Sequence, residues 1–314
     1  MNVPLVSFCI PVHNSGKFLE QTLQSVLRQD YGAIEVVCVN DHSCDDSAAI
    51  LERYAARVNS FHARRKGAAA ARNQAYQHST GAFIVFLDSD DLLNPGYVSS
   101  QVARAVQQPA SVVVSKWGRF YRHPQDFRED RFIVKSDLTF HDWIVRYWTA
   151  NRHMTSPGRV LIPRSIVEKA GPWNEALSLN DDLDFYVRVF SCAEKIRYNE
   201  QACLYYRSGI GGLSSKTRGY PYQLSNWTSI ENATALAMAR YGDDPKVKRA
   251  CANMWQLFIY DNYPDNMDLV QSAKARIRQY GGADYAFPAG GWTKLLCRMV
   301  GWRMVKQVKH RIGR

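Results

Sequence analysis

Three carboxylates lie within four consecutive residues, Asp88 to Asp91 (DSDD), directly after an apolar run, Ala82 to Leu87 (AFIVFL). The run has the composition of a strand that is covered on both faces. Residues two apart in an extended strand end point the same way, so we expect Asp88 and Asp90 to converge. Their oxygens suit Mg²⁺ or Mn²⁺, which often keep coordination positions open for substrate phosphates. An Asp-x-Asp pair is also common in turns and helix caps, but its place after a buried strand favours a metal site.

Polar side chains follow two other predicted strands. Leu5 to Val12 is followed by His13 and Asn14, and Ile34 to Val39 is followed shortly by Asp41. In open sheets with helices between the strands, ligands bind beyond the carboxyl ends of the strands. Acidic groups gathered there repel one another unless a cation or a donor-rich ligand lies among them. We therefore expect a ligand site at this edge; for any single cluster, a solvated acidic rim is the alternative.

Helical patterns separate these strands, which predicts crossover connections and an α/β fold with a mostly parallel sheet. Helices are expected over residues 18–27, from about 45 to 58, and over Ala68 to His78, the last ending before Gly81. Shorter patterns predict strands at 111–115, 159–163 and 202–206, the last at a sheet edge, and a helix at 181–190. From 220 to 280 the pattern is helical, with breaks expected at Pro221, Pro245 and Pro264.

The composition of the 314 residues is that of a globular protein, with 46% apolar and 22% charged residues. No apolar run approaches the roughly 20 residues that span a bilayer, so we predict no transmembrane helix. The start of the chain lacks the features of a secretory signal, so we predict no signal peptide. Seven cysteines without a C-x-x-C pair argue against a zinc ribbon or a disulfide framework and favour reduced thiols in the cytosol. The net charge of +11 indicates an anionic partner.

The ordered segments VSFCIPVHN, VVCVNDHSCDDS, GAAAARNQAYQHSTGAFIVFLDSDD and NDDLDFYVRV together resemble the family 2 glycosyltransferases. These are inverting enzymes with the GT-A nucleotide-sugar-binding fold, a Rossmann-like sheet flanked by helices. The resemblance runs from about Val6 to about Arg207. It implies a GT-A catalytic domain over residues 1–215, and we expect residues 216–314 to form a helical C-terminal extension.

The resemblance also implies which residues bind the nucleotide. Pro11 and Asn14 would line the nucleoside pocket. Asp41 would accept a hydrogen bond from the base, which suits the N3–H of uracil or thymine and hence a UDP- or dTDP-sugar donor. Arg72 would run beside the nucleotide, and Asp88 would face the ribose.

The implied catalytic groups are two carboxylates. Asp90 would bind the Mn²⁺ or Mg²⁺ ion that bridges the diphosphate, and Asp182 would be the general base, with Asp181 in place of the family's preceding Glu. The chemistry agrees, because a single displacement inverts the anomeric carbon and needs only one base to deprotonate the acceptor hydroxyl. A carboxylate at such a helix start can also serve merely as an N-cap.

The acceptor or lid side is assigned to three residues, Trp173, Asp181 and Arg207. Trp173 matches the family's acceptor-side loop, so contact with the acceptor is expected. Many family members carry a His after the last strand, where it completes the metal shell, but this sequence has Arg207 and a glycine-rich segment that looks mobile and able to close over the donor. Arg207 either contacts the diphosphate or is a solvated charge at a sheet edge.

The tail from Trp292 to Arg314 has seven Lys and Arg residues and no acidic residue. Its apolar residues fall close to one helical face: Trp292, Leu295, Leu296, Met299, Trp302 and Val305. This pattern predicts an amphipathic helix lying on anionic lipid. The alternative is a packed terminal helix with a basic outer face.

These observations together predict an inverting, metal-assisted transferase that moves a sugar from a UDP- or dTDP-sugar to a hydroxyl of a glycan or lipid-linked acceptor. We expect a cytoplasmic protein, peripheral on the inner face of the cell membrane, that serves cell-surface polysaccharide synthesis. One alternative is a nucleotidyltransferase that makes sugar nucleotides, although the glycine-rich basic loop usual after its first strand is replaced by His13-Asn14-Ser15-Gly16. The other is a non-enzymatic nucleic-acid binder, for which the chain has no recognisable reading module, so no nucleic acid is expected.

Overall fold

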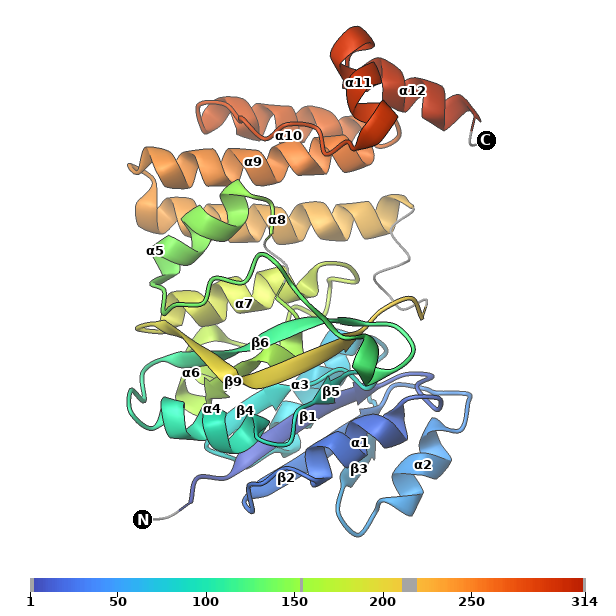
Figure 1. Ribbon diagram of the computed structural model, residues 1–314, viewed down its shortest axis with the longest axis vertical. Helices are drawn as coiled ribbons and strands as arrows, with labels where there is room; N and C mark the ends of the chain where they lie inside the picture. Colours follow the sequence, from blue (N-terminus) through green and yellow to red (C-terminus); the bar gives the residue numbers. More distant parts are fainter. Residues whose placement is uncertain (1–2, 153–154, 211–218, 313–314) are drawn as a thin grey trace. The chain divides into compact units, whose positions relative to one another are not determined.

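The computed structural model describes residues 3–152, 155–210 and 219–312 (Figure 1). Its contacts divide the chain into two compact units. The first, which we call the sheet unit, consists of Met1–Phe140 and Met154–Lys216. The second, the helical unit, consists of His141–His153 and Thr217–Arg314. The structure thus adds residues 141–153 to the second unit, while the predicted division at 215/216 stays a prediction.

The described part of the sheet unit contains nine strands in the order β3-β2-β1-β4-β8-β6-β9-β5, with β7 beside β6. The parallel half of the sheet comprises β1 (Val6–Val12), β2 (Ile34–Asn40), β3 (Asn59–His62) and β4 (Phe83–Phe86). The mixed half comprises β5 (Leu92–Leu93), β6 (Val112–Phe120), β7 (Arg128–Glu129), β8 (Val160–Pro163) and β9 (Ile196–Arg207). Because β8 runs antiparallel to both β4 and β6, the parallel order stops at β4. The predicted α/β class is confirmed.

Helices flank this sheet, as the alternation of patterns predicts (Figure 1). They are α1 (Leu19–Leu27), α2 (Ser47–Arg53), α3 (Ala68–His78), α4 (Tyr97–Ala105), α6 (Arg164–Ala170) and α7 (Asp181–Cys192). β1 is buried along its whole length, which explains its continuous apolar run. Side chains of β1 and of the buried stripe of α1 join one hydrophobic core, and α3 packs against β1 and β2.

Two elements of the sheet unit differ from the prediction. The helix expected to reach Val58 ends at Arg53, and the missed strand β3 follows it. β3 has the sequence NSFH and is mostly exposed at the sheet edge, so it carries no apolar alternation. The strand expected at 202–206 extends from Ile196 to Arg207 and lies between β6 and β5 rather than at the edge. An irregularity in its pairing with β6 after Ser115 interrupts the period-two pattern.

The helical unit contains α8 (Tyr220–Tyr241), α9 (Pro245–Asn262), α10 (Met267–Gln279), α11 (Gly291–Val300) and α12 (Trp302–Ile312). α5 (Phe140–Trp143) begins at the last residue of the sheet unit's first segment and continues as a π-helix over Ile144–Trp148. α9 packs between α8 and α10 (Figure 1). Pro221 and Pro245 lie in the first turns of α8 and α9, where a missing N–H is harmless, and Pro264 follows α9. The three prolines therefore mark the helix boundaries as predicted.

The expectation of one amphipathic helix from residue 292 to the end is wrong. Gly301 separates α11 from α12 with φ 80° and ψ 150°, a conformation that is essentially restricted to glycine. The turn also changes which side chains share a face. Trp302 packs against Tyr260 and Phe287, and Val305 is buried, whereas the predicted apolar positions of α11 are open to solvent. Residues 313–314 lie outside the described residues.

None of the helices in the described residues is both long and apolar enough to cross a bilayer. All seven cysteines are free thiols. Cys9 and Cys38 are buried in β1 and β2, where burial raises the pKa of the Cys9 thiol to about 12. These two cysteines therefore act as small core residues.

We predict that Gly81→Ala destabilises the sheet unit. A Cβ at position 81 would lie 2.8 Å from both the carbonyl oxygen of Leu5 and the backbone nitrogen of Ser7, closer than such atoms approach. The backbone of β1 must shift to relieve this overlap, at a cost of about 1–3 kcal/mol. The matched control is Gly32→Ala, because nothing lies within 4 Å of a Cβ there. Urea titration should show a lower midpoint for the first variant only, and equal midpoints would contradict the packing seen at Gly81.

Candidate functional site

The side chain of Arg72 connects three elements of the sheet unit. Its Nη2 donates to Asp88 Oδ1 at 2.7 Å, and its Nη1 donates to Asp181 Oδ2 at 2.9 Å. Arg72 comes from the buried face of α3, Asp88 from the end of β4, and Asp181 from the start of α7. Burial alone lowers the pKa of Arg72, but the charges of Asp88 and Asp181 outweigh it and raise that pKa. The guanidinium is therefore a permanent cation at the centre of the predicted site.

An aromatic platform supports this cation. The Arg72 guanidinium carbon lies 4.4 Å from the centre of the Trp173 ring, which stacks on Phe185 of α7 at 4.1 Å. Asn73 fixes the backbone of Trp173 by accepting from its N–H at 2.8 Å and donating to its carbonyl at 2.9 Å. Trp173 is only 2% exposed, which corrects the expectation that it contacts the acceptor. It holds Arg72 in place instead, together with Asn73.

Asp182 follows Asp181 in the first turn of α7. Its Oδ1 is shielded from solvent and accepts no hydrogen bond from the described residues. The N-cap position is occupied by Asn180, so the alternative that Asp182 merely caps the helix is wrong. Burial, followed by repulsion from Asp181, raises the pKa of Asp182 well above its usual range, although Arg72 opposes this shift. Such a carboxyl is a stronger base than one in water.

The carboxylates after β4 are also close together. Burial raises the pKa of Asp90 to about 7, and the charge of Asp88 adds to this effect. Asp91 is fully buried, and its Oδ1 accepts a hydrogen bond from the backbone N–H of Arg207 at 2.9 Å. These carboxyl groups therefore form a cluster at the end of β4 in which negative charge is unfavourable.

Arg207, the last residue of β9, contacts this cluster of carboxyl groups. Its Nε donates to the backbone carbonyl of Asp90 at 2.8 Å, and its Nη2 donates to Gln21 at 2.8 Å. The guanidinium carbon lies 4.4 Å from the Phe18 ring centre and 4.5 Å from that of Phe120. With 5% exposure, Arg207 is no solvated edge charge, so that alternative is wrong. The glycine-rich segment that follows it falls largely outside the described residues.

The donor chemistry around Asp90 fits a divalent cation. Within the described residues no three His, Cys, Asp or Glu side chains gather in metal-binding geometry. Asp90 nevertheless lies in a partly buried place, where burial and then repulsion by the charge of Asp88 raise its pKa. A cation would relieve this repulsion as a proton does.

The predicted nucleoside residues lie at the ends of β1 and β2. Asp41 Oδ2 accepts a hydrogen bond from the N–H of Gly67 at 2.9 Å, and Gly67 is the N-cap residue of α3. Asp41 therefore holds the start of the helix whose second turn carries Arg72. Asn14 has a left-handed φ of 49°, and its Oδ1 accepts from the N–H of Cys44 at 2.9 Å. Pro11 is buried within β1, one residue before the strand ends at Val12.

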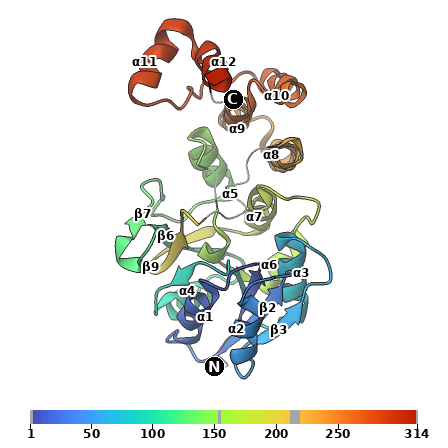
Figure 2. The same ribbon diagram turned by 90° about the vertical axis from the view of Figure 1, so that its right-hand side faces the viewer.

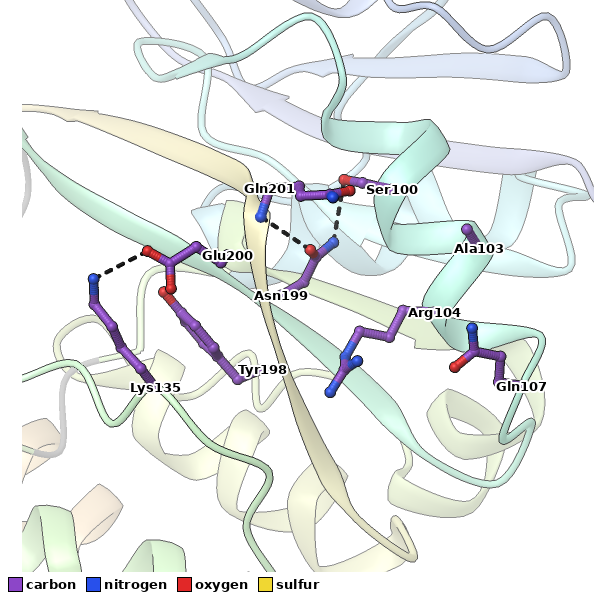
Figure 3. Close-up of a pocket in the computed structure, with 9 residues that line it drawn as sticks. All are labelled: Ser100, Ala103, Arg104, Gln107, Lys135, Tyr198, Asn199, Glu200 and Gln201. Carbon is purple, nitrogen blue, oxygen red and sulfur yellow. Dashed lines mark hydrogen bonds and ion pairs between the residues drawn. The ribbon is translucent and has the colours of Figure 1, made fainter.

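A groove of about 390 Å³ lies elsewhere in the sheet unit (Figure 3). It is lined by residues of α4 and β9 together with Gln107 and Lys135, and none of the predicted site residues is among them. Its charged side chains are already paired, Arg104 with Asp137 at 2.7 Å and Lys135 with Glu200 at 3.1 Å. The groove therefore offers no unpaired charge to a ligand.

The chain is similar in sequence to known proteins. The family model described as "Glycosyl transferase family 2" matches residues 7–171. The putative glycosyltransferase EpsH of Bacillus subtilis is 33% identical over 219 residues, and the uncharacterized glycosyltransferase EpsJ of the same organism is 28% identical over 222 residues. Each match covers 68% of this chain and 63% of the relative, so the chain spans less than two thirds of their length.

Among solved structures, residues 1–349 of S. aureus TarS in complex with UDP-GlcNAc superimpose on the chain with a TM-score of 0.62. The superposition covers 88% of this chain and 92% of the TarS chain at 19% sequence identity. At that identity the likeness establishes the fold alone.

We predict that Arg72→Met lowers the free energy of unfolding by about 3–5 kcal/mol, because it leaves Asp88 and Asp181 as uncompensated, partly buried charges. Arg72→Lys should lower the free energy of unfolding by less, since lysine keeps the charge but cannot bridge both carboxylates. The matched control is Arg65→Met, which removes an exposed ion pair with Glu175 and should change stability by less than about 1 kcal/mol. Equal losses at positions 65 and 72 in urea titration would refute the central role of Arg72.

Proposed function

Because the chain belongs to glycosyl transferase family 2, we propose that it transfers a sugar from a nucleotide-diphosphate donor to a hydroxyl group, with inversion at the anomeric carbon. The observation that carries this proposal is the environment of Asp182. One oxygen of its carboxyl is buried and receives no hydrogen bond from the described residues, and the carboxyl lies beside the ion pairs of Arg72 with Asp88 and Asp181. That combination suits one base acting next to a bound donor.

We infer a UDP- or dTDP-sugar as the donor. Asp41 presents a carboxylate at the end of β2, where it would accept the N3–H of a pyrimidine base, with Asn14 and Pro11 beside it. Asp88 would accept a hydrogen bond from the ribose on the side that Arg72 does not occupy. The S. aureus TarS structures in complex with UDP-GlcNAc and with UDP support the choice of nucleotide.

In the proposed reaction Asp182 removes the proton of the acceptor hydroxyl as that oxygen attacks the anomeric carbon. The bond to the nucleoside diphosphate breaks in the same step, so one displacement inverts the centre. Arg72 acts through other residues, because both ends of its guanidinium are engaged by Asp88 and Asp181. We therefore assign it to positioning these carboxylates rather than to contact with the nucleotide. Asp181 then serves as one of its two anchors.

We propose that Asp90 binds a Mn²⁺ or Mg²⁺ ion. When bound, such an ion stabilises the negative charge on the departing diphosphate. Asp90 contributes the carboxylate, and Asp88 raises the local negative potential that attracts the cation. Arg207 donates a hydrogen bond to the backbone carbonyl of Asp90, so we infer that it positions the Asp90 carboxylate.

For the acceptor we propose a hydroxyl of a glycan or of a lipid-linked sugar in cell-surface polysaccharide synthesis. Family membership favours this reading over a nucleic-acid binder. The remaining alternative, a sugar-nucleotide nucleotidyltransferase, differs in its products. Incubation with a panel of UDP- and dTDP-sugars and Mn²⁺ should release the nucleoside diphosphate, whereas release of pyrophosphate from a nucleoside triphosphate and a sugar phosphate would overturn the proposal.

We predict that Asp182→Asn lowers kcat by a factor of about 10²–10⁴ while leaving the Kd for the donor nearly unchanged, because it removes the base but not the pocket. The control Glu194→Gln changes an exposed carboxylate just beyond α7 and should keep full activity. In the wild type, activity should already fall at pH values above the usual range of carboxyl pKa values as the pH decreases. The reason is that the raised pKa of Asp182 protonates this base at a higher pH than a carboxylate in water. Normal turnover by Asp182→Asn would refute the assignment.

We predict that Asp90→Ala weakens donor binding in the presence of Mn²⁺ but not in its absence, because the side chain acts through the cation. Calorimetric titration with UDP, with and without Mn²⁺, measures both affinities. Loss of the Mn²⁺-dependent part of the affinity is the expected result. An unchanged dependence on Mn²⁺ would show that the ion binds without Asp90.

A further inference from the structure

The apolar side of α11 has no covering within the described residues. None of its residues is buried, and Trp292 and Met299 are 82% and 73% exposed. Leu295, Leu296 and Val300 are about half exposed, and the five side chains recur at the three- and four-residue spacing of one helical face. An exposed row of large apolar side chains on a monomer usually marks an interaction site.

Helix α12 is attached to the rest of the helical unit by one side only. Trp302 stacks on Phe287 and contacts Tyr260 edge-on at 4.8 Å, and the Lys306 ammonium donates to the carbonyl oxygen of Tyr260. The other side carries Met304, Val308 and Ile312 at four-residue intervals, each about half exposed or more. Helix α12 is therefore an anchored helix with a second uncovered apolar row.

The turn at Gly301 holds α11 beside α12 (Figure 2). The Gly301 N–H donates to the carbonyl of Cys297 at 3.1 Å, and the Lys309 ammonium donates to Thr293 Oγ1 at 3.1 Å. We call the eight exposed apolar side chains of this pair the terminal apolar surface: Trp292, Leu295, Leu296, Met299, Val300, Met304, Val308 and Ile312.

The charge around this surface indicates which kind of partner binds it. Residues 291–312 contain six Lys and Arg residues and no Asp or Glu. Lys294, Arg298 and Arg311 form no ion pair within the described residues, so their charges are available. A second copy of this chain, with a net charge of +11, would bring like charge against like. An anionic bilayer instead offers an apolar layer directly beneath a layer of phosphates.

We propose that the terminal apolar surface inserts into the headgroup boundary of an anionic lipid bilayer, with α12 as the anchor to the protein and α11 as the inserted helix. The basic side chains of both helices contact lipid phosphates. Interfacial helices of this kind reach about 5–10 Å into the headgroup and acyl boundary. The proposal concerns the helical unit and requires neither donor nor acceptor, so it goes beyond the proposed function.

Cosedimentation of the full chain with lipid vesicles tests this proposal. Vesicles of three parts phosphatidylcholine to one part phosphatidylglycerol should bind the protein, whereas pure phosphatidylcholine should bind it much more weakly. The variant Lys294→Gln/Arg298→Gln should lose about fivefold in affinity per charge removed. The variant Trp292→Ser/Met299→Ser should lose at least about tenfold, because two large side chains no longer leave water. Added salt should weaken binding by the wild type.

The helical unit also provides matched controls. Leu224→Ser/Met267→Ser removes two exposed apolar side chains from α8 and α10, and Lys274→Gln/Arg278→Gln removes two basic side chains from α10. Both controls should bind anionic vesicles as the wild type does. All the substituted side chains lie at the surface, and far-ultraviolet circular dichroism verifies that each variant is folded.

Three outcomes would overturn the proposal: no binding of the wild type to anionic vesicles, equal binding by the terminal variants and their controls, or equal affinity for neutral and anionic lipid. A wild-type dimer that Trp292→Ser/Met299→Ser converts to a monomer, without vesicle binding, would assign the surface to a second copy of the chain. Vesicle binding is measured without nucleotide sugar, so its failure and a failure of the transferase proposal are separate results.

Discussion

The pairing of one guanidinium with two carboxylates is the interaction on which the rest of the site depends. Arg72 joins the end of β4 to the start of α7 through Asp88 and Asp181, which lie 16 and 109 residues away in the chain. A buried cation of this kind is tolerated only when it is paired, and its partners are tolerated only in its presence. The arrangement therefore fixes where α7 begins, and with it the position of Asp182.

The same burial that makes the site costly also raises the pKa of its carboxyl groups. Burial and mutual repulsion raise the pKa of Asp90, Asp91, Asp181 and Asp182 together. Carboxylates in water would be weak bases and would attract a cation only weakly. Burial in the sheet unit and mutual repulsion raise the pKa of Asp182 and of Asp90, although Arg72 and Arg207 oppose these shifts. The surrounding core supplies the stability that this clustering of charge removes.

The helical unit shows a different use of packing. α8, α9 and α10 bury most of their apolar side chains, whereas α11 and one side of α12 leave theirs in water. Gly301 makes this division possible, because its backbone conformation ends one helix and redirects the next. We thus propose donor binding and attachment to lipid for side chains of separate units.

Local sequence patterns determined the strands β1, β2 and β4, the helix α3 with its bounds, and the edge of the sheet at which Asp41, Asp88 and Asp90 lie. Such features follow from periodicity and from the polar residues after each strand, which depend only on near neighbours in the chain. Only the tertiary structure decided the partners of Arg72, the burial of Trp173 against it, the exposed strand β3 and the division of the tail into α11 and α12. Those outcomes depend on contacts between residues up to 109 positions apart, or on a single glycine turn, and no short-range pattern of apolar and polar residues encodes them.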